Sequence, residues 1–354
     1  MKRVKTNDLF PGMFVDRAVL SGEGVVLLDR GIHLTKAHIN SLQRWGVPFL
    51  YIDESKDIPA ARPDGSKLTA GEFLEKYIET IEIIKNAFHH IRYFKEVPIA
   101  QMRELAEERI PLLAETAGVI EYLYEIRLHS DYTFQHSLNV AVIAGILGKW
   151  RTYKGTALKN LIFAGLLHDI GKIAIPLAIL DKPSKLSPKE FEIIKQHSQS
   201  GYQLVKDSAL VPDSTKLGIL QHHERLDGSG YPDGMKGGRI HDYAKIIAVA
   251  DIYDAMTADR SYRRRLTPLA ALESISDQMY EKLETGICMT FLDNMRDYHS
   301  ANSVLLSNGQ RAKIIVLSTD NRRWTKPVVC IANGTLIDLQ NEEEISVVDL
   351  YEEG

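Results

Sequence analysis

Histidine and aspartate side chains, which can bind metal ions, gather in the middle of this sequence. Five of the twelve histidines fall between residues 136 and 223, namely His136, His168, His197, His222 and His223. Asp169 directly follows one of them, and Asp251 and Asp254 come later, three residues apart and on one face of any helix that carries them. Imidazole and carboxylate together suit divalent ions such as iron, manganese or zinc. The sequence therefore predicts a metal site.

The number of these side chains indicates two ions. Five histidines together with Asp169 and Asp251 are too many ligands for one ion. Two ions bridged by a carboxylate would use them all, and a pair about 3.5–4 Å apart promotes in-line displacement at phosphorus. A phosphodiester is therefore the substrate class that this ligand set favours.

Each of these residues also has a purely structural interpretation. A single histidine in an apolar helix, such as His136 or His197, is more often a hydrogen-bonded core residue than a ligand. Asp169 and Lys172 could form a simple surface pair, and Asp251 could cap a helix. The joint interpretation is favoured because all of them lie on one mainly helical stretch whose apolar faces would point the ligands inward.

Helices must position these residues, since residues 98 to 300 carry helical patterns almost throughout. The segment "SPKE" is a capping box that starts a helix at Ser187 and places His197 on or beside its buried side. Adjacent side chains on a helix point about 100° apart, so His222 and His223 can share an ion only near a helix end. The glycine-rich loop that follows them supplies that end.

The chain divides into four predicted parts. Residues 1–60 form a small N-terminal α+β unit, and residues 61–110 form a linker, which includes most of "PAARPDGSK", and a helical connector. Residues 111–300 form the helical domain with the candidate ligands. Residues 301–354 form a small β appendage of two hairpins around Asn-Gly turns, in "SVLLSNGQRAKIIVLS" and "PVVCIANGTLIDL". The predicted fold class is therefore mainly α.

An apolar stripe in the connector leaves two interpretations open. Its members follow alternating gaps of three and four, at Leu74, Tyr77, Ile81, Ile84, Phe88 and Ile91. The stripe indicates either a helix packed on its own domain or the contact of a homodimer.

Composition excludes several classes of protein. The chain has 354 residues, of which 44% are hydrophobic, so it can bury a sizeable core. A formal net charge of −4 gives no general attraction to nucleic acid or to an anionic membrane surface. The two cysteines, Cys288 and Cys330, form neither a disulfide framework nor a thiolate zinc motif. With no apolar run long enough to span a membrane, a cytoplasmic location is predicted.

Several segments of the helical region resemble the HD-GYP family. They are "HS" at residue 136, "LLHDIGKIAIP" at 166–176, "LDKPSKLSPKEFEIIKQH" at 180–197, "HHERLDGSGYP" at 222–232 and "VADIYDAMTADRSYR" at 249–263. That family is a subclass of HD-domain phosphohydrolases that hydrolyse the bacterial second messenger cyclic di-GMP. The resemblance covers roughly residues 110 to 300, and the block at 222–232 is its most specific part. "DLFPGMFV" is similar to the small N-terminal unit often attached to such domains.

The resemblance implies a two-metal site. One ion would be held by His136, His168, Asp169 and Asp251. Asp169 would bridge to a second ion held by His197, His222 and His223. Either iron or manganese would suit these ligands. Some members bind a third metal through a glutamate four residues before the first histidine, but Tyr132 stands there, so a third metal is not supported.

The resemblance also implies residues that act on the substrate. Lys172 matches a lysine beside the scissile phosphate, where a cation can stabilise developing charge. Tyr231, Arg260 and Arg263 match positions that contact the dinucleotide. For Asp254 two interpretations stay open, a hydrogen bond to a metal ligand or a helix-stabilising polar contact.

The predicted reaction is the hydrolysis of cyclic di-GMP to linear pGpG, with a second cut to GMP as an extension. Two ions would lower the pKa of a bridging water, so that hydroxide attacks phosphorus in line. One alternative keeps the site but changes the substrate to another cyclic dinucleotide or to a mononucleotide, and the Gly-Tyr-Pro loop argues against the latter. A second alternative is a catalytically silent cyclic di-GMP receptor that signals through a protein partner. Such receptors usually lose ligands, whereas every matched position is kept here.

Overall fold

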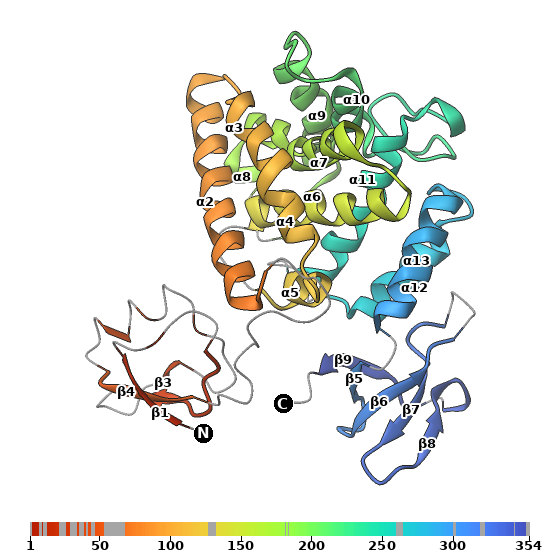
Figure 1. The fold of residues 1–354 in the computed structure, drawn as a ribbon. Coiled ribbons are helices and arrows are strands. Elements are labelled where there is room, and N and C mark those ends of the chain that lie inside the picture. Colours follow the sequence, from red (N-terminus) through yellow and green to blue (C-terminus); the bar gives the residue numbers. More distant parts are fainter. Residues whose placement is uncertain are drawn as a thin grey trace. The chain divides into compact units, whose positions relative to one another are not determined.

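The structure is a computed structural model of the whole chain, shown in Figure 1. It describes residues 2–6, 9, 13–20, 26–28, 34, 39, 42–43, 47–52, 68–126, 132–180, 182, 184–259, 265–299, 302–318, 323–342 and 344–351. Two compact units can be distinguished. One comprises residues 1–83 with 111–122, and the other comprises 84–110 with 123–353. The four domains expected from the sequence, with their three boundaries, stay a prediction.

The middle of the chain is helical, which confirms the predicted mainly α fold class. The helices are α2 (Ala70–Phe94), α3 (Ile99–Glu104), α4 (Ile110–Ala114), α5 (Val119–Glu125), α6 (Tyr132–Trp150), α7 (Gly155–Leu167), α8 (Leu177–Leu180), α9 (Pro188–Val205), α10 (Asp213–Gln221), α11 (Asp242–Thr257), α12 (Pro268–Gln278) and α13 (Thr285–His299). A π-helical turn, Leu105–Arg109, joins α3 to α4, and a short 3-10 helix, Ile170–Ala174, follows α7.

Helix α6 forms the centre of the helical region and packs against α7 and α11. Every residue from His136 to Gly148 is buried, so this helix is apolar nearly all round, as expected of an interior helix. Small residues let the central helices come close. A β-carbon on Gly165 of α7 would lie 3.0 Å from the Cα of Ala141 on α6. The buried position of α6 keeps His136 away from bulk water.

The C-terminal residues form a five-stranded antiparallel sheet. Its strands are β5 (Ser303–Leu306), β6 (Arg311–Val316), β7 (Val328–Ile331), β8 (Leu336–Asp338) and β9 (Val347–Tyr351), in the order β8-β7-β6-β5-β9. Both predicted hairpins are confirmed. The glycines of their Asn-Gly turns, Gly309 and Gly334, have φ values of 80° and 85°, which other residues rarely adopt. The sequence did not single out β9, which pairs with β5 and completes the sheet.

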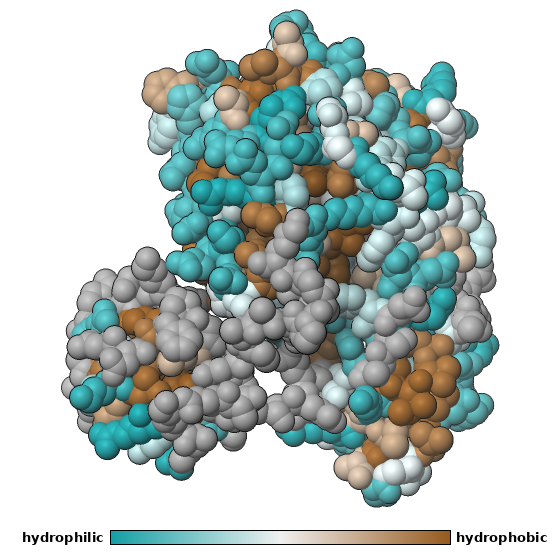
Figure 2. All heavy atoms as spheres, in the orientation of Figure 1, coloured by the Kyte–Doolittle hydropathy of each residue, from teal (hydrophilic) through white to brown (hydrophobic). Residues whose placement is uncertain are grey.

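Apolar side chains lie exposed on this sheet. Ile315 and Val316 of β6 and Leu336 of β8 are 49%, 55% and 62% exposed. Figure 2 shows the apolar surface over these strands, beside more hydrophilic surface on the helices. Within the described part of the chain, no helix combines the length and the apolar character needed to cross a membrane.

The N-terminal unit contains two short antiparallel strand pairs. β1 (Lys2–Lys5) pairs with β4 (Phe49–Ile52), and β2 (Val19–Leu20) pairs with β3 (Val26–Leu28). Buried apolar residues such as Val15, Leu34 and Leu42 form its core. The segment "TKAHINSLQRWG", whose pattern indicates the helix of the predicted α+β unit, lies largely outside the described residues. The linker "PAARPDGSK" lies outside them as well.

The apolar stripe of α2 is already buried within the single chain. Tyr77, Ile81, Ile84, Phe88 and Ile91 are each at most 3% exposed. Packing within the chain therefore explains why these residues are apolar, as in the interpretation of a helix packed on its own domain. A homodimer contact stays a prediction.

Candidate metal centre

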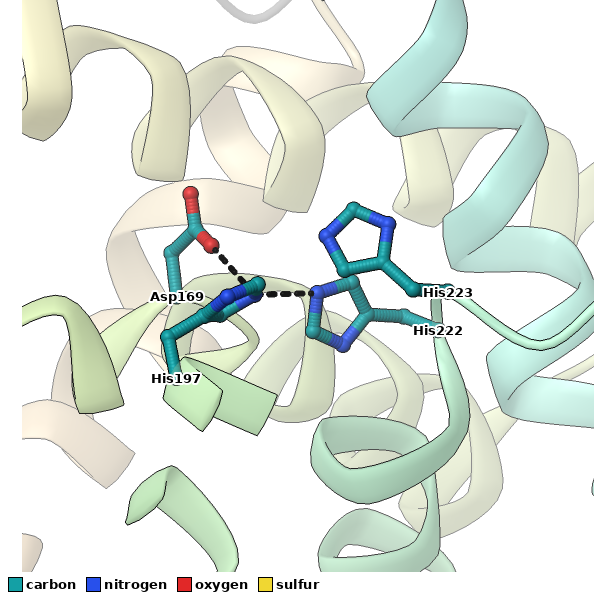
Figure 3. Close-up of side chains that lie close together, drawn as sticks. All are labelled: Asp169, His197, His222 and His223. Atoms are coloured by element: carbon teal, nitrogen blue, oxygen red, sulfur yellow. Dashed lines mark hydrogen bonds and ion pairs between the residues drawn. The ribbon is translucent and has the colours of Figure 1, made fainter. Parts of the chain in front are cut away.

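Seven histidine and aspartate side chains converge between the central helices and form two groups. Within each group, the candidate ligand atoms all lie within 4.8 Å of one another. The first group is His136, His168 and Asp251, and the second is Asp169, His197, His222 and His223. Figure 3 shows the second group, whose side chains point toward one another. These are the seven residues that the sequence marked as candidate ligands.

Helix ends and helix faces bring these side chains together. His168 directly follows the last residue of α7, and Asp169 directly precedes the first residue of the short 3-10 helix Ile170–Ala174. The predicted capping box is confirmed, since Ser187 accepts from the Glu190 amide while the Glu190 carboxylate accepts from Ser187. His222 directly follows the last residue of α10, which confirms that the histidine pair stands at a helix end.

Three of the histidines share one hydrogen-bonding pattern. The Nδ1 atoms of His168, His197 and His222 each lie 2.7 Å from the carbonyl oxygen three residues earlier in the chain. A carbonyl oxygen can only accept, so Nδ1 carries the proton. In the neutral ring Nε2 is then left with a free lone pair, and this atom faces the centre of the cluster. Burial lowers the pKa of His197 and His222, which favours the neutral ring.

This pattern fits a bound cation. The Nε2 atoms of His197 and His222 lie 3.2 Å apart, although neither carries a proton to share. Nε2 of His168 and Oδ1 of Asp169 are buried and have no hydrogen-bond partner. Buried polar atoms normally have partners, so orphaned acceptors that face one another indicate a place for positive charge. Nitrogen and oxygen donors of this kind suit divalent metal ions.

Asp169 connects the two groups. Its Oδ2 atom lies 3.3 Å from Nε2 of His168 and 3.5 Å from Nε2 of His136, while Oδ1 lies 3.3 Å from Nε2 of His197. Lys172 donates to Oδ2 at 2.5 Å. Burial alone would raise the pKa of Asp169, but the Lys172 ammonium group holds it well below its ordinary value. The carboxylate therefore stays ionised, with one oxygen directed toward each group.

His136 is oriented by a carboxylate behind it. Its Nδ1 donates to Oδ2 of Asp254 at 2.6 Å, and the side chain of Asn139 donates to the other oxygen of Asp254 at 2.7 Å. Nε2 of His136 then faces Oδ1 of Asp251 at 3.1 Å. Burial would lower the pKa of His136, but its hydrogen bonds to Asp251 and Asp254 outweigh this effect and raise the pKa to about 9.

Replacing Asp254 with asparagine should weaken metal binding. The amide cannot accept as strongly from His136, so the ring loses part of its orientation and basicity. We expect the affinity for divalent ions to fall roughly 10–100-fold, as is usual when a group that orients a ligand is changed. Competition with a chromophoric chelator would measure it. Asp242→Asn, on an exposed residue of the same helix, serves as the control. If Asp254→Asn binds metal as tightly as that control, the orienting role is wrong.

A close backbone contact sets Asp169 beside His197. Gly171, two residues after Asp169, packs against α9 at His197 and Gly201. A β-carbon on Gly171 would lie 1.9 Å from the carbonyl oxygen of His197 and 2.4 Å from the amide nitrogen of Gly201. Only glycine fits this position, because real β-carbons essentially never come so close to backbone atoms.

Sequence reasoning missed the residues that hold the glycine-rich loop. Buried Glu224 accepts from the backbone amides of Asp233 and Met235 at 2.8 Å each, which fixes the loop on both sides of its turn. Gly230 approaches so closely that a β-carbon there would lie 2.4 Å from the carbonyl oxygen of His223. The glutamate directly after two candidate ligands was the available signal, because a carboxylate buried beside them needs partners.

The loop brings Tyr231 onto His223. The two rings lie 4.6 Å apart with an interplanar angle of 31°. Burial raises the pKa of Tyr231, so the phenol keeps its proton and can donate. Lys172 lies at the same site, on Asp169. Arg260 and Arg263, the other expected substrate contacts, lie outside the described residues.

Tyr132 occupies the position that the resemblance linked to a third metal. Its ring stacks on His136, with 5.8 Å between the ring centres and an interplanar angle of 12°. A phenol held in this way offers no carboxylate, so the described residues supply the ligands of two groups here.

Fold and site together define a helical protein whose core holds two adjoining groups of histidine and aspartate side chains suited to metal ions. The model of the HD domain family matches residues 104–284, more than half of the 354-residue chain. The chain belongs to this family, and the "HHERLDGSGYP" block together with its relatives assigns it to the HD-GYP group.

Three curated proteins illustrate these relatives. A cyclic di-GMP phosphodiesterase of Pseudomonas aeruginosa is 29% identical over 305 residues, which cover 78% of this chain and 72% of that protein. A cyclic di-GMP phosphodiesterase of Thermotoga maritima is 33% identical, with 60% of this chain and 62% of that protein covered. A 3'3'-cGAMP-specific phosphodiesterase of Vibrio cholerae is 37% identical, with 49% of this chain and 40% of that protein covered. The chain thus spans less than two thirds of the last two.

A solved structure supports the fold. An HDG"Y"P protein from Bdellovibrio bacteriovorus superposes with a TM-score of 0.56 over 83% of this chain and 99% of that chain. The two sequences are 17% identical, so the likeness concerns the fold alone.

Proposed function

We propose that this chain is a metal-dependent phosphodiesterase that hydrolyses cyclic di-GMP to linear pGpG. The observation that carries the proposal is the convergence of seven candidate ligands whose inward-facing acceptors require positive charge. Two of the relatives described above are named as phosphodiesterases of the same messenger. A catalytically silent receptor is less well supported, because such a protein has no need to keep a complete ligand set.

Two divalent ions, iron or manganese, would complete the site. His136, His168 and Asp251 would hold one ion, and His197, His222 and His223 would hold the other, with Asp169 between them. When bound, such ions activate water as a nucleophile and take up negative charge on a phosphodiester. The mixture of imidazole and carboxylate, without thiolate, supports these hard to borderline metals.

The protein's own groups would orient the substrate and support charge. Lys172, with its ammonium group at Asp169, can stabilise the charge that develops on a phosphate held at the site. Tyr231, whose ring lies against His223, keeps its proton, so its hydroxyl can donate a hydrogen bond to the substrate. Asp254 would hold the His136 ring so that Nε2 faces its ion.

The test is the assay of metal-loaded protein. Protein purified anaerobically should contain about two ions per chain and convert cyclic di-GMP to pGpG. Stripping with a chelator should remove the activity, and adding back iron or manganese should restore it. Two ions per chain with no product over hours would contradict the enzymatic function and favour the receptor.

A second candidate substrate is another cyclic dinucleotide. The observation in its favour is the relative named as specific for 3'3'-cGAMP. Turnover of a panel of cyclic dinucleotides would separate the two, with the higher kcat/KM naming the substrate. A second cut to GMP would appear as loss of pGpG in the same assay. Cytoplasmic location and signalling partners stay predictions.

A further inference from the structure

The described side chains of the candidate metal centre differ in their exposure. His136, Asp169 and His197 have side chains that are at most 2% exposed, whereas those of His223 and Asp251 are 20% and 12% exposed. The side chain of Lys172 is 22% exposed. Among the described residues of the centre, His223, Asp251 and Lys172 therefore form the side that a substrate can reach.

Helix α9 carries two side chains next to this opening. Lys195 lies with its Nζ atom 5.9 Å from the ring centre of Tyr231, which itself stacks on His223. The same Nζ atom lies 5.0 Å from the ring centre of Phe191. Phe191, Lys195, Tyr231 and His223 thus form a continuous row from the surface of α9 to the exposed edge of the centre.

Phe191 is a partly exposed aromatic residue on the surface of α9. It is 47% exposed, although burying a phenylalanine side chain would stabilise the fold by about 1.5–3 kcal/mol. An exposed ring beside a lysine is the arrangement that binds nucleotides without reading their sequence. The base stacks on the ring, and the ammonium group attracts a phosphate.

Resting on the proposed function, we infer that Phe191 and Lys195 form a subsite for one nucleotide half of the cyclic dinucleotide. The base of that half stacks on Phe191. The Lys195 ammonium pairs with the phosphate that is not cleaved, while the other phosphate lies at Asp169 and Lys172. The subsite explains how a centre built for a single phosphodiester selects a substrate that carries two.

Glu192 provides a test in which substrate binding should become tighter rather than weaker. Its Oε1 atom accepts from Lys195 at 2.7 Å, and both groups are at the surface. If Lys195 binds a phosphate, Glu192 competes with that phosphate for the ammonium. If Lys195 only stabilises the helix, removing Glu192 has no effect on the substrate.

The experiment compares KM and kcat for cyclic di-GMP across matched variants. Phe191→Ala should raise KM about ten-fold, since a base stacked on an aromatic ring contributes about 1–3 kcal/mol. Lys195→Gln should raise KM as well, whereas Lys195→Arg, which keeps the positive charge, should leave KM near the wild-type value. Glu192→Gln should lower KM about two-fold, because the Lys195 ammonium group no longer pairs with a carboxylate. The kcat should change little, because these contacts are the same before and during the reaction. Tyr93→Ala, on another exposed aromatic residue, is the control.

Failure of the subsite can be told from failure of the proposed function. If metal-loaded wild-type protein gives no product, the same variants are compared by the Kd of cyclic di-GMP in calorimetry. The subsite is supported if either constant rises in Phe191→Ala and Lys195→Gln and falls in Glu192→Gln. It is overturned if all three variants match Tyr93→Ala, with metal content and melting temperature unchanged.

Discussion

Asp169→Asn is expected to reduce cyclic di-GMP hydrolysis about a hundred- to a thousand-fold, the size of effect found when one preorganised electrostatic group is removed. One oxygen of Asp169 faces His136 and His168, and the other faces His197, so the carboxylate serves both groups at once. Asparagine has nearly the same shape but no charge. Its amide would donate protons toward histidine lone pairs, such as the unpartnered Nε2 of His168, that would otherwise bind an ion.

The metal content separates this explanation from a general defect. Elemental analysis of Asp169→Asn should find fewer ions per chain than in the wild type, while the helix content by circular dichroism stays the same. Asp213→Asn, at a side chain that is 93% exposed, should keep both activity and metal. Retention of both ions and of activity in Asp169→Asn would falsify the bridging role.

Gly171→Ala is expected to destabilise the protein by about 3 kcal/mol and to impair the metal centre. The added methyl group would meet the carbonyl oxygen of His197 and the amide of Gly201, which are backbone atoms and cannot rotate away. The 3-10 helix would have to move off α9. Asp169 would then leave His197, which lies only 3.3 Å away.

Urea unfolding would measure the loss of stability, and chelator competition would measure the loss of metal affinity. Gly238→Ala is a matched control, because a β-carbon there would meet nothing within 4 Å. It should unfold like the wild type. A Gly171→Ala variant that unfolds at the same urea concentration as Gly238→Ala would show that the contact between the 3-10 helix and α9 is less tight than described.

The candidate ligands could be predicted from the sequence because their chemistry is carried by residue type. Histidine and aspartate are rare inside apolar helices unless they form hydrogen bonds or bind a ligand. Adjacent histidines such as His222 and His223 can bind one ion together only at a helix end. The capping box at Ser187 likewise depends on residues three positions apart. Such local rules need no knowledge of the tertiary fold.

The supporting residues could not be predicted in the same way. Asn139 and Glu224 are ordinary polar residues until the fold buries them against Asp254 and the glycine-rich loop. In the sequence, Gly171 looks like an ordinary turn glycine. Its importance comes from the tertiary contact with α9, a helix formed by later residues. The strand β9 escaped notice since its pairing with β5 joins residues far apart in sequence.

The separation of the ligands along the chain links metal binding to folding itself. The seven ligands run from His136 to Asp251, and five segments of the chain must be in place before these side chains meet. An unfolded chain has no such site, so any ion that binds acts as a cross-link of the native state. At a free concentration of about one hundred times Kd, a single ion adds about 2.7 kcal/mol to the free energy of unfolding. Metal supply would thus set the fraction of the protein that is folded as well as its activity.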